Sequence, residues 1–110
     1  MAYDEALAER VKEHFAARPD LTAKKMFGGL CVLLGGHMTC GIVGEALMLR
    51  LGKAGAAAAL AEPHVREMDF TGKPMAAMVY VDPPGIRTEA QLGAWLDRAA
   101  AHADSLPRKG

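Results

Sequence analysis

The stretch from residue 26 to residue 51 alternates apolar runs with turn-forming pairs, a pattern typical of short strands folded back on one another. Gly35-Gly36 predicts a two-residue hairpin turn, because both central positions of such a turn adopt positive φ. Gly44-Glu45 predicts a second turn of the same length. The sequence therefore predicts three antiparallel strands here, around which we expect the rest of the chain to pack.

The two turns also predict a register for these strands. The first places Leu33 opposite Met38 and Cys31 opposite Cys40, and the second places Cys40 opposite Leu49. Because successive side chains of a strand point to opposite faces, one predicted face is wholly apolar and collects Cys31, Leu33, Met38, Cys40, Ile42, Leu47, Leu49 and Leu51. The other predicted face is mixed, and is too apolar in its first strand for plain solvent; it carries Leu30, Val32, Leu34, His37, Thr39, Val43, Met48 and Arg50.

Three helices are predicted outside this stretch. The first runs over residues 4–18 with Asp4 as its N-cap, and a short alanine-rich helix begins at Gly52 and is closed by Pro63. The third opens on the capping box formed by Thr88 and Gln91. The first and third helices each carry one apolar stripe, made of Leu7, Val11 and Phe15 and of Leu92, Trp95, Leu96, Ala99 and Ala103.

Two further strands are predicted over residues 65–70 and 76–82, separated by a turn at residues 71–74. The second of them is apolar on both faces, so we expect it to lie inside the sheet or against a partner. Gly28-Gly29 predicts a bulge or a close backbone approach. The expected fold is α+β and two-layered, with an antiparallel sheet, helices on one face and the order α-β-β-β-α-β-β-α.

Length and charge narrow the class of protein. A chain of 110 residues is one domain, which we place at residues 1–106, followed by a disordered basic tail at 107–110. The formal net charge of +0 gives no overall attraction to polyanions, so direct nucleic-acid binding is not expected. No leader or membrane-spanning run is present, and two cysteines are too few for a secreted disulfide framework, so we expect a cytoplasmic protein.

The residues present no catalytic, cofactor or metal motif. Cys31, Cys40 and His37 come closest to a metal-ligand set, but the predicted register points His37 away from both cysteines. The directly opposed pair of Cys31 and Cys40 is interpreted first as two small core side chains and second as a thiol redox switch. We therefore expect no enzymatic activity, no cofactor and no metal.

Several segments resemble the N-terminal domain of the TfoX/Sxy family over nearly the whole chain. They are the stretch 26–29, the Gly-Gly turn followed by Met38 and Cys40-Gly41, the segment 66–75 with its Met-Asp-Phe-Thr-Gly core, and Tyr80-Val81. The resemblance implies a fold similar to type III secretion chaperones. It also implies a link to regulators of natural competence, which act with the cyclic-AMP receptor protein at promoters. Full-length members carry a second, helical C-terminal domain, and this chain is expected to be a stand-alone copy of the first.

The function that these observations favour is a non-enzymatic regulatory module that acts through protein–protein contact. We expect it to be a homodimer, and the resemblance implies a role in transcription regulation. The predicted contact residues are Leu30, Val32, Leu34, Met48, Met78 and Tyr80, because helices on one side of the sheet leave the second face bare. One alternative is a small-ligand-binding or thiol-redox protein that uses Gly28-Gly29 and the hairpin of Cys31 and Cys40. A further alternative, DNA binding through Lys24, Lys25, Arg66 and Lys73, is disfavoured by the neutral charge.

Overall fold

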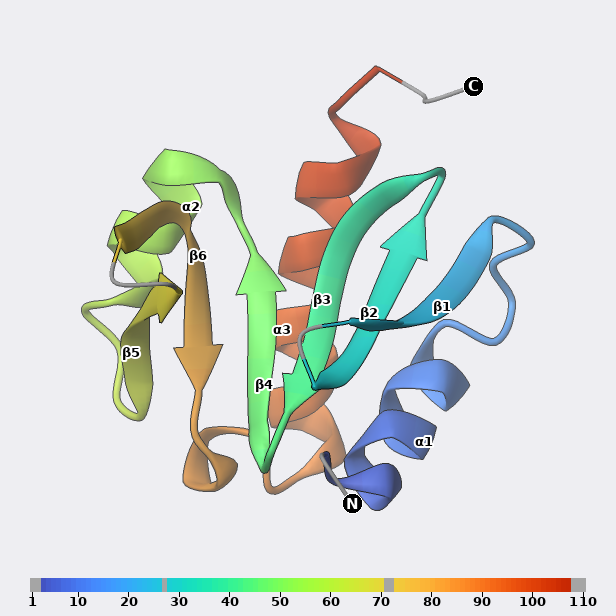
Figure 1. The fold of residues 1–110 in the computed structure, drawn as a ribbon, viewed down its shortest axis with the longest axis horizontal. Coiled ribbons are helices and arrows are strands. Elements are labelled where there is room, and N and C mark those ends of the chain that lie inside the picture. The colour runs from blue at the N-terminus through green and yellow to red at the C-terminus, as the bar shows by residue number, and fades with distance from the viewer. Residues whose placement is uncertain (1–2, 27, 71–72, 108–110) are drawn as a thin grey trace.

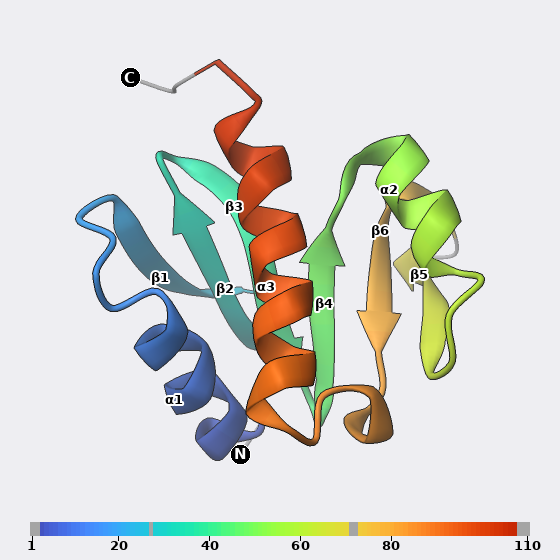
Figure 2. The same cartoon turned by 180° about the vertical axis from the view of Figure 1, so that it is seen from behind.

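The fold has two layers, a six-stranded antiparallel sheet and a layer of helices on one of its faces (Figures 1 and 2). The computed structural model describes residues 3–26, 28–70 and 73–107, without the side chains of residues 26, 69, 70 and 73–76. Along the chain the elements are α1 (Glu5–His14), β1 (Leu21–Met26), β2 (Gly29–Leu34), β3 (His37–Val43), β4 (Ala46–Arg50), α2 (Gly52–Ala59), β5 (Val65–Phe70), β6 (Lys73–Val81), the 3-10 turn η1 (Pro83–Gly85) and α3 (Glu89–Asp104). The predicted α+β fold is confirmed.

The strands lie in the order β1-β2-β3-β4-β6-β5. The strand β6 pairs with β4 on one side and β5 on the other, so the prediction of an interior position for this apolar strand is confirmed. The strand β1 was not predicted, because its sequence, LTAKKM, is polar at its centre. It lies at the edge of the sheet, where lysines such as Lys24 and Lys25 discourage pairing with another chain.

The helix α1 begins where the sequence predicts it, after the N-cap residue Asp4. The carboxylate of Asp4 accepts hydrogen bonds from the backbone N–H groups of Ala6 and Leu7, at 2.9 and 3.2 Å. The apolar stripe of Leu7, Val11 and Phe15 is buried. The helix itself ends at His14, earlier than the predicted residue 18.

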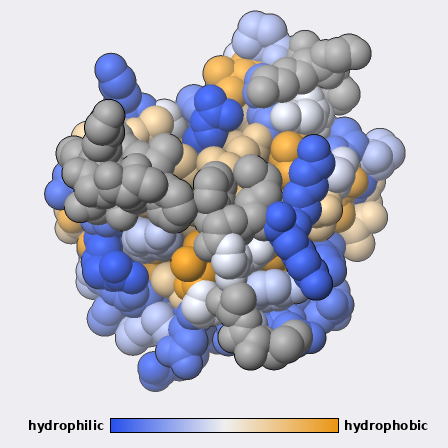
Figure 3. Space-filling model, in the orientation of Figure 1, coloured by the Kyte–Doolittle hydropathy of each residue, from blue (hydrophilic) through white to orange (hydrophobic). Residues whose placement is uncertain are grey.

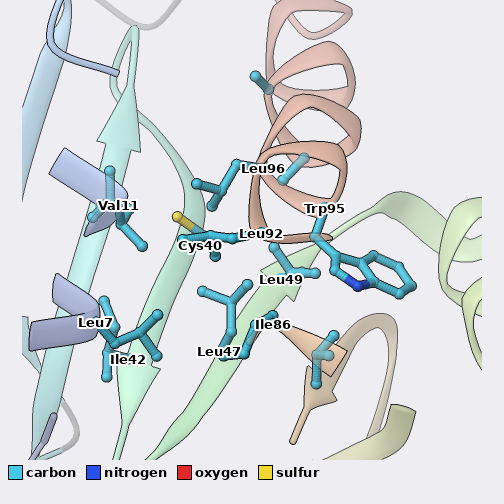
Figure 4. Packing of buried hydrophobic residues seen from close by; sticks show 14 of the residues in the cluster. Leu7, Val11, Cys40, Ile42, Leu47, Leu49, Ile86, Leu92, Trp95 and Leu96 are labelled. Atoms are coloured by element: carbon cyan, nitrogen blue, oxygen red, sulfur yellow. The ribbon is translucent and has the colours of Figure 1, made fainter. Parts of the chain in front are cut away.

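The third helix also follows its prediction. The Thr88 hydroxyl accepts from the Gln91 backbone N–H at 3.1 Å, and the Gln91 side-chain oxygen accepts from the Thr88 backbone N–H at 3.0 Å, which completes the capping box. The predicted stripe is buried, and Figure 4 shows Leu92 and Leu96 projecting from α3 toward Cys40, while the Trp95 ring points away from them.

Three ion pairs join the chain around α1 to α3. Arg10, His14 and Arg18 are spaced four residues apart, and they contact Glu89, Asp97 and Asp104 at 2.7, 2.8 and 2.8 Å. All three acidic partners are largely exposed, so each pair contributes at most about 1 kcal/mol. The apolar stripe beneath stabilises the packing, and the ion pairs fix how far along α3 the first helix lies.

The second helix is short and has small side chains. Its buried residues Ala56 and Ala59 belong to the same core as Val79 and Val81 of β6. It begins at Gly52, which has φ +77°, and a Cβ there would lie 2.7 Å from the Cε1 atom of His102. The positive φ therefore favours glycine at this position, while the His102 ring could move aside for a larger residue.

Candidate functional site

The pairing of β2 with β3 contains a β-bulge that the sequence analysis did not foresee. Next to the turn, Leu34 lies opposite His37 and Leu33 opposite Met38, as predicted. The register then shifts, so that Val32 lies opposite Cys40 and Thr39 is the extra residue. The buried Thr39 hydroxyl donates to the His37 carbonyl at 3.1 Å, a local bond of the kind that competes with a regular ladder. The register predicted for β2 and β3 beyond Leu33 and Met38 is wrong for this reason.

Because of the bulge, three predicted contact residues lie on the face of the sheet opposite the one predicted for them. Leu30, Val32 and Leu34 are 6%, 0% and 1% exposed and belong to the main core, which α1 and α3 cover. The prediction that they lie on the bare face is wrong. The extra residue in β3 places Cys40 and Ile42 on the helix-covered face together with Val32. Each side chain of β2 therefore points to the face opposite the one predicted for it.

The two cysteines are not the opposed pair that the sequence predicted. Cys31 lies opposite Gly41, and Cys40 belongs to the main core on the other side of the sheet. Both thiols are free and buried. Burial raises the pKa of Cys31, and burial together with the nearby Cys31 raises the pKa of Cys40 to about 12. A hairpin pair positioned for a disulfide is therefore absent.

The sheet face away from the helices carries a second apolar cluster, which we call the methionine face. Its buried members all contain sulfur: Cys31, Met48, Met68 and Met78. Partly buried side chains complete it: Leu33, Met38, Val43, Ala77 and Tyr80. Figure 3, which looks on to this face, shows patches of apolar surface among polar residues.

One row of residues crosses the methionine face from edge to edge. In register, from β1 to β5, it contains Lys24, Cys31, Gly41, Met48, Tyr80 and Arg66. Directly opposed residues share a face. A Cβ on Gly41 would lie 2.7 Å from the Met48 Cε atom, so the Met48 side chain occupies the space above this glycine.

Both ends of the row are positively charged, but they do not form one basic patch. Lys24 and Arg66 lie on the two edge strands of a six-stranded sheet, roughly 24 Å apart at about 4.8 Å per strand. Arg66 is paired with Asp82 at 2.8 Å, which lowers the pKa of that carboxyl, and its guanidinium lies 5.0 Å from the Tyr80 ring centroid. Lys25 lies opposite Leu30, on the other side of the strand from Lys24. The side chain of Lys73, the fourth predicted residue, is outside the described residues.

The predicted close approach at Gly28-Gly29 is confirmed in part. A Cβ on Gly29 would lie 2.2 Å from the Ile42 carbonyl oxygen, so only glycine fits between these strands. Gly28, at φ +73°, has no atom within 4 Å of such a Cβ. Gly28 therefore provides the positive φ of the turn, and Gly29 allows the close approach of β2 to β3.

In each of two clefts outside the methionine face, an arginine side chain is already paired within the fold. The larger, about 280 Å³, lies between α1, the β3–β4 turn and η1, and its Arg10 bonds to Glu89 and the Ile86 carbonyl. The other, about 250 Å³, is lined partly by Arg98, which stacks 4.4 Å from the Trp95 ring centroid and pairs with Glu62. These contacts join elements of the fold to one another.

Within the part of the chain that the structure describes, no group of three or more His, Cys, Asp or Glu side chains is placed to hold a metal ion. The methionine face was missed in part by sequence reasoning, which assigned Cys31, Leu33 and Met38 to the covered side. The available signal was the number of methionines, seven in 110 residues. The bulge places Met38 on the same face as Met48 and Met78, which could not be read from spacing.

Comparison with known proteins decides the family. The family model described as the TfoX N-terminal domain matches residues 13–103. The chain belongs to the TfoX N-terminal domain family. The match extends from the end of α1 to the last turn of α3, so it contains all six strands and the whole methionine face. No curated protein and no solved structure matches the chain significantly.

Membership of the TfoX N-terminal domain family confirms the resemblance noted in the sequence. It gives the chain a competence-regulator-like domain, from a family that is not known for enzymatic activity. Among the described residues no helix has the length and apolar character needed to cross a bilayer.

Proposed function

We propose that this TfoX N-terminal domain is a non-enzymatic regulatory module that acts through protein–protein contact, and that the methionine face is its contact surface. The observation that carries the proposal is a sheet with helices on one face only, whose other face bears a cluster of apolar side chains. An apolar cluster on a sheet face that no helix covers is a common place for a partner to bind.

The composition of the face suits an interaction surface. Leu33, Met38, Val43 and Tyr80 are partly exposed, and three buried methionines lie among them. Unbranched thioether side chains repack at low cost when a partner approaches. Of the six contact residues predicted from the sequence, Tyr80 is the one that we propose to touch the partner. Met48 and Met78 are buried members of the same cluster.

Charged residues at the margin favour an orientation for the partner. Lys24 and Arg50 lie on the methionine face by register, opposite Cys31 and Met78. Rim charges affect the rate of association more than the affinity. We propose a homodimer as the first occupant, and a transcription regulator as the physiological partner by virtue of the family.

The experiment compares two surface variants of the purified chain by size-exclusion chromatography with light scattering, at tens of micromolar protein. Tyr80→Asp places a charge in the methionine face, and we expect it to convert a dimer to a monomer. Leu60→Asp is the matched control, because Leu60 is an exposed apolar side chain (39%) at the end of α2. A wild-type monomer, or equal effects of both variants, would refute dimerisation through this face.

The regulatory part of the proposal has a separate test. Purified cyclic-AMP receptor protein from the same host is mixed with the wild-type chain and with each variant, and complex formation is measured by chromatography. We expect binding that Tyr80→Asp weakens and Leu60→Asp leaves intact. Absence of binding by the wild-type chain would exclude this regulator as the partner.

A further inference from the structure

The sulfur atoms of this protein are unevenly distributed between its two apolar clusters. All four methionines whose side chains are described, Met38, Met48, Met68 and Met78, belong to the methionine face, together with Cys31. The main core is larger, and Cys40 is its only sulfur-containing member among the described residues. Packing alone gives no reason for this segregation, since leucine, isoleucine and valine fill the main core.

Gly41 brings the central sulfur side chains together. Cys31 is on β2 and Met48 is on β4, two strands apart, which is roughly 9.5 Å. A side chain on the intervening β3 position would separate them, but that position is Gly41. The Met48 methyl group lies above it, 2.7 Å from where a Cβ would be, and the Cys31 Cα is 3.5 Å from the same point. The Met48 side chain therefore reaches across β3, with its methyl group on the side of Cys31.

Two further thioethers lie next to this pair. Met78 is on β6, two residues from Tyr80, which is directly opposite Met48, so Met78 is a diagonal neighbour of Met48. Met68 belongs to the same contact cluster and comes from β5, at the irregularity in its pairing with β6. All four side chains are less than 5% exposed.

We propose that Cys31, Met48 and Met78, with Met68 beside them, form a binding site for one soft monovalent cation, Cu(I). Thiolate and thioether sulfur are the ligands that Cu(I) prefers, and they are poor ligands for hard divalent ions. On binding, the Cys31 S–H bond is broken, its proton leaves to solvent, and a sulfur–copper bond forms without change in the oxidation state of either partner.

Charge balance selects Cu(I) over a divalent ion at this site. A single thiolate and a single Cu(I) form a neutral pair, and thioether ligands add no charge. One divalent ion with the same ligands would leave a net positive charge in an apolar cluster, which is costly without a further anion.

The test is an anaerobic titration of the reduced full chain with Cu(I) in competition with bicinchoninate. We expect one Cu(I) per chain at the wild-type site. Cys31→Ala should abolish this binding, while Cys40→Ala, the matched control in the main core, should leave it unchanged. Met48→Leu and Met78→Leu keep an apolar side chain of similar size. Loss of an outer partner of a metal site already costs about 10- to 100-fold in affinity, so each of these variants should cost roughly tenfold or more.

Melting of each metal-free variant shows whether it is folded, and Ag(I) in place of Cu(I) should raise the melting temperature of the wild-type chain but not that of folded Cys31→Ala. Three outcomes would overturn the proposal: no Cu(I) bound against the competitor, equal loss on removing either cysteine, or full affinity in both leucine variants. These readouts measure metal binding, whereas chromatography with light scattering measures association, so failure here is distinct from failure of the proposed contact function.

Discussion

Gly41→Ala is the substitution that tests the architecture of the methionine face most directly. Gly41 is in the middle of β3 and has no positive φ, so alanine meets no backbone strain there. The added Cβ would lie 2.7 Å from two atoms, the Met48 Cε and the Leu30 carbonyl oxygen. The first belongs to the end of a flexible side chain, and the second to the backbone of the neighbouring strand.

The two contacts have different consequences for stability. Met48 can move its methyl group away, at the cost of its packing over β3. The Leu30 carbonyl can move only if β2 shifts relative to β3. Overpacking of this kind typically costs about 1–3 kcal/mol, and replacing glycine by alanine within a strand returns about 0.5–1 kcal/mol of chain entropy. We therefore expect a net loss of about 1–2 kcal/mol in the free energy of unfolding.

The assay is urea unfolding followed by the fluorescence of Trp95, the one tryptophan in the chain. The midpoint should fall without a change in the slope of the transition, and the melting temperature should fall by roughly 5–10 °C. An unchanged or raised midpoint would show that β2 and β3 can separate at little cost, and would refute the packing described here.

A double-mutant cycle apportions the loss between the two contacts. Met48→Ala alone should cost about 2–5 kcal/mol as a buried truncation. The double variant Gly41→Ala/Met48→Ala should be less destabilised than the sum of the two, because one of the two clashes is gone. Strict additivity would mean that the Leu30 carbonyl carries the whole cost.

Three other substitutions test single interactions. Thr88→Ala removes the hydroxyl of the capping box and should lower the free energy of unfolding by about 0.5–2 kcal/mol in urea titrations; an unchanged midpoint would show that the cap does not contribute. Arg66 lowers the pKa of Asp82 by donating hydrogen bonds, so this pair stabilises the fold above about pH 4 and the contribution is lost as the pH falls below that. The destabilisation caused by Arg66→Gln should therefore be larger at pH 7 than at pH 2, and melting curves that show the opposite order would contradict the pairing. Cys40 is fully buried with a pKa of about 12, so in a Cys31→Ala background it should react with iodoacetamide at pH 8 only as fast as the protein unfolds, as measured by mass spectrometry; rapid labelling of the folded chain would place this thiol at the surface.

The helices, their caps and the hairpin turns could be predicted from the sequence because each depends on residues close together in the chain. Asp4 and Thr88 cap their helices within three residues, and the turns at Gly35-Gly36 and Gly44-Glu45 fix the pairs nearest to them. The register of β3 with β4, including Cys40 opposite Leu49, followed from turn geometry alone. Family membership was likewise contained in short sequence segments.

The tertiary structure decided which face of β2 is covered. The bulge at Thr39 depends on a hydrogen bond to His37 and on the fit of Val32 and Cys40 under the helices, which no spacing in the sequence records. A single extra residue exchanges the two faces of a strand, so it moved Leu30, Val32 and Leu34 into the core and left Cys31 among the methionines. The edge strand β1 also formed only through pairing with β2, since its polar sequence has no apolar face of its own to bury.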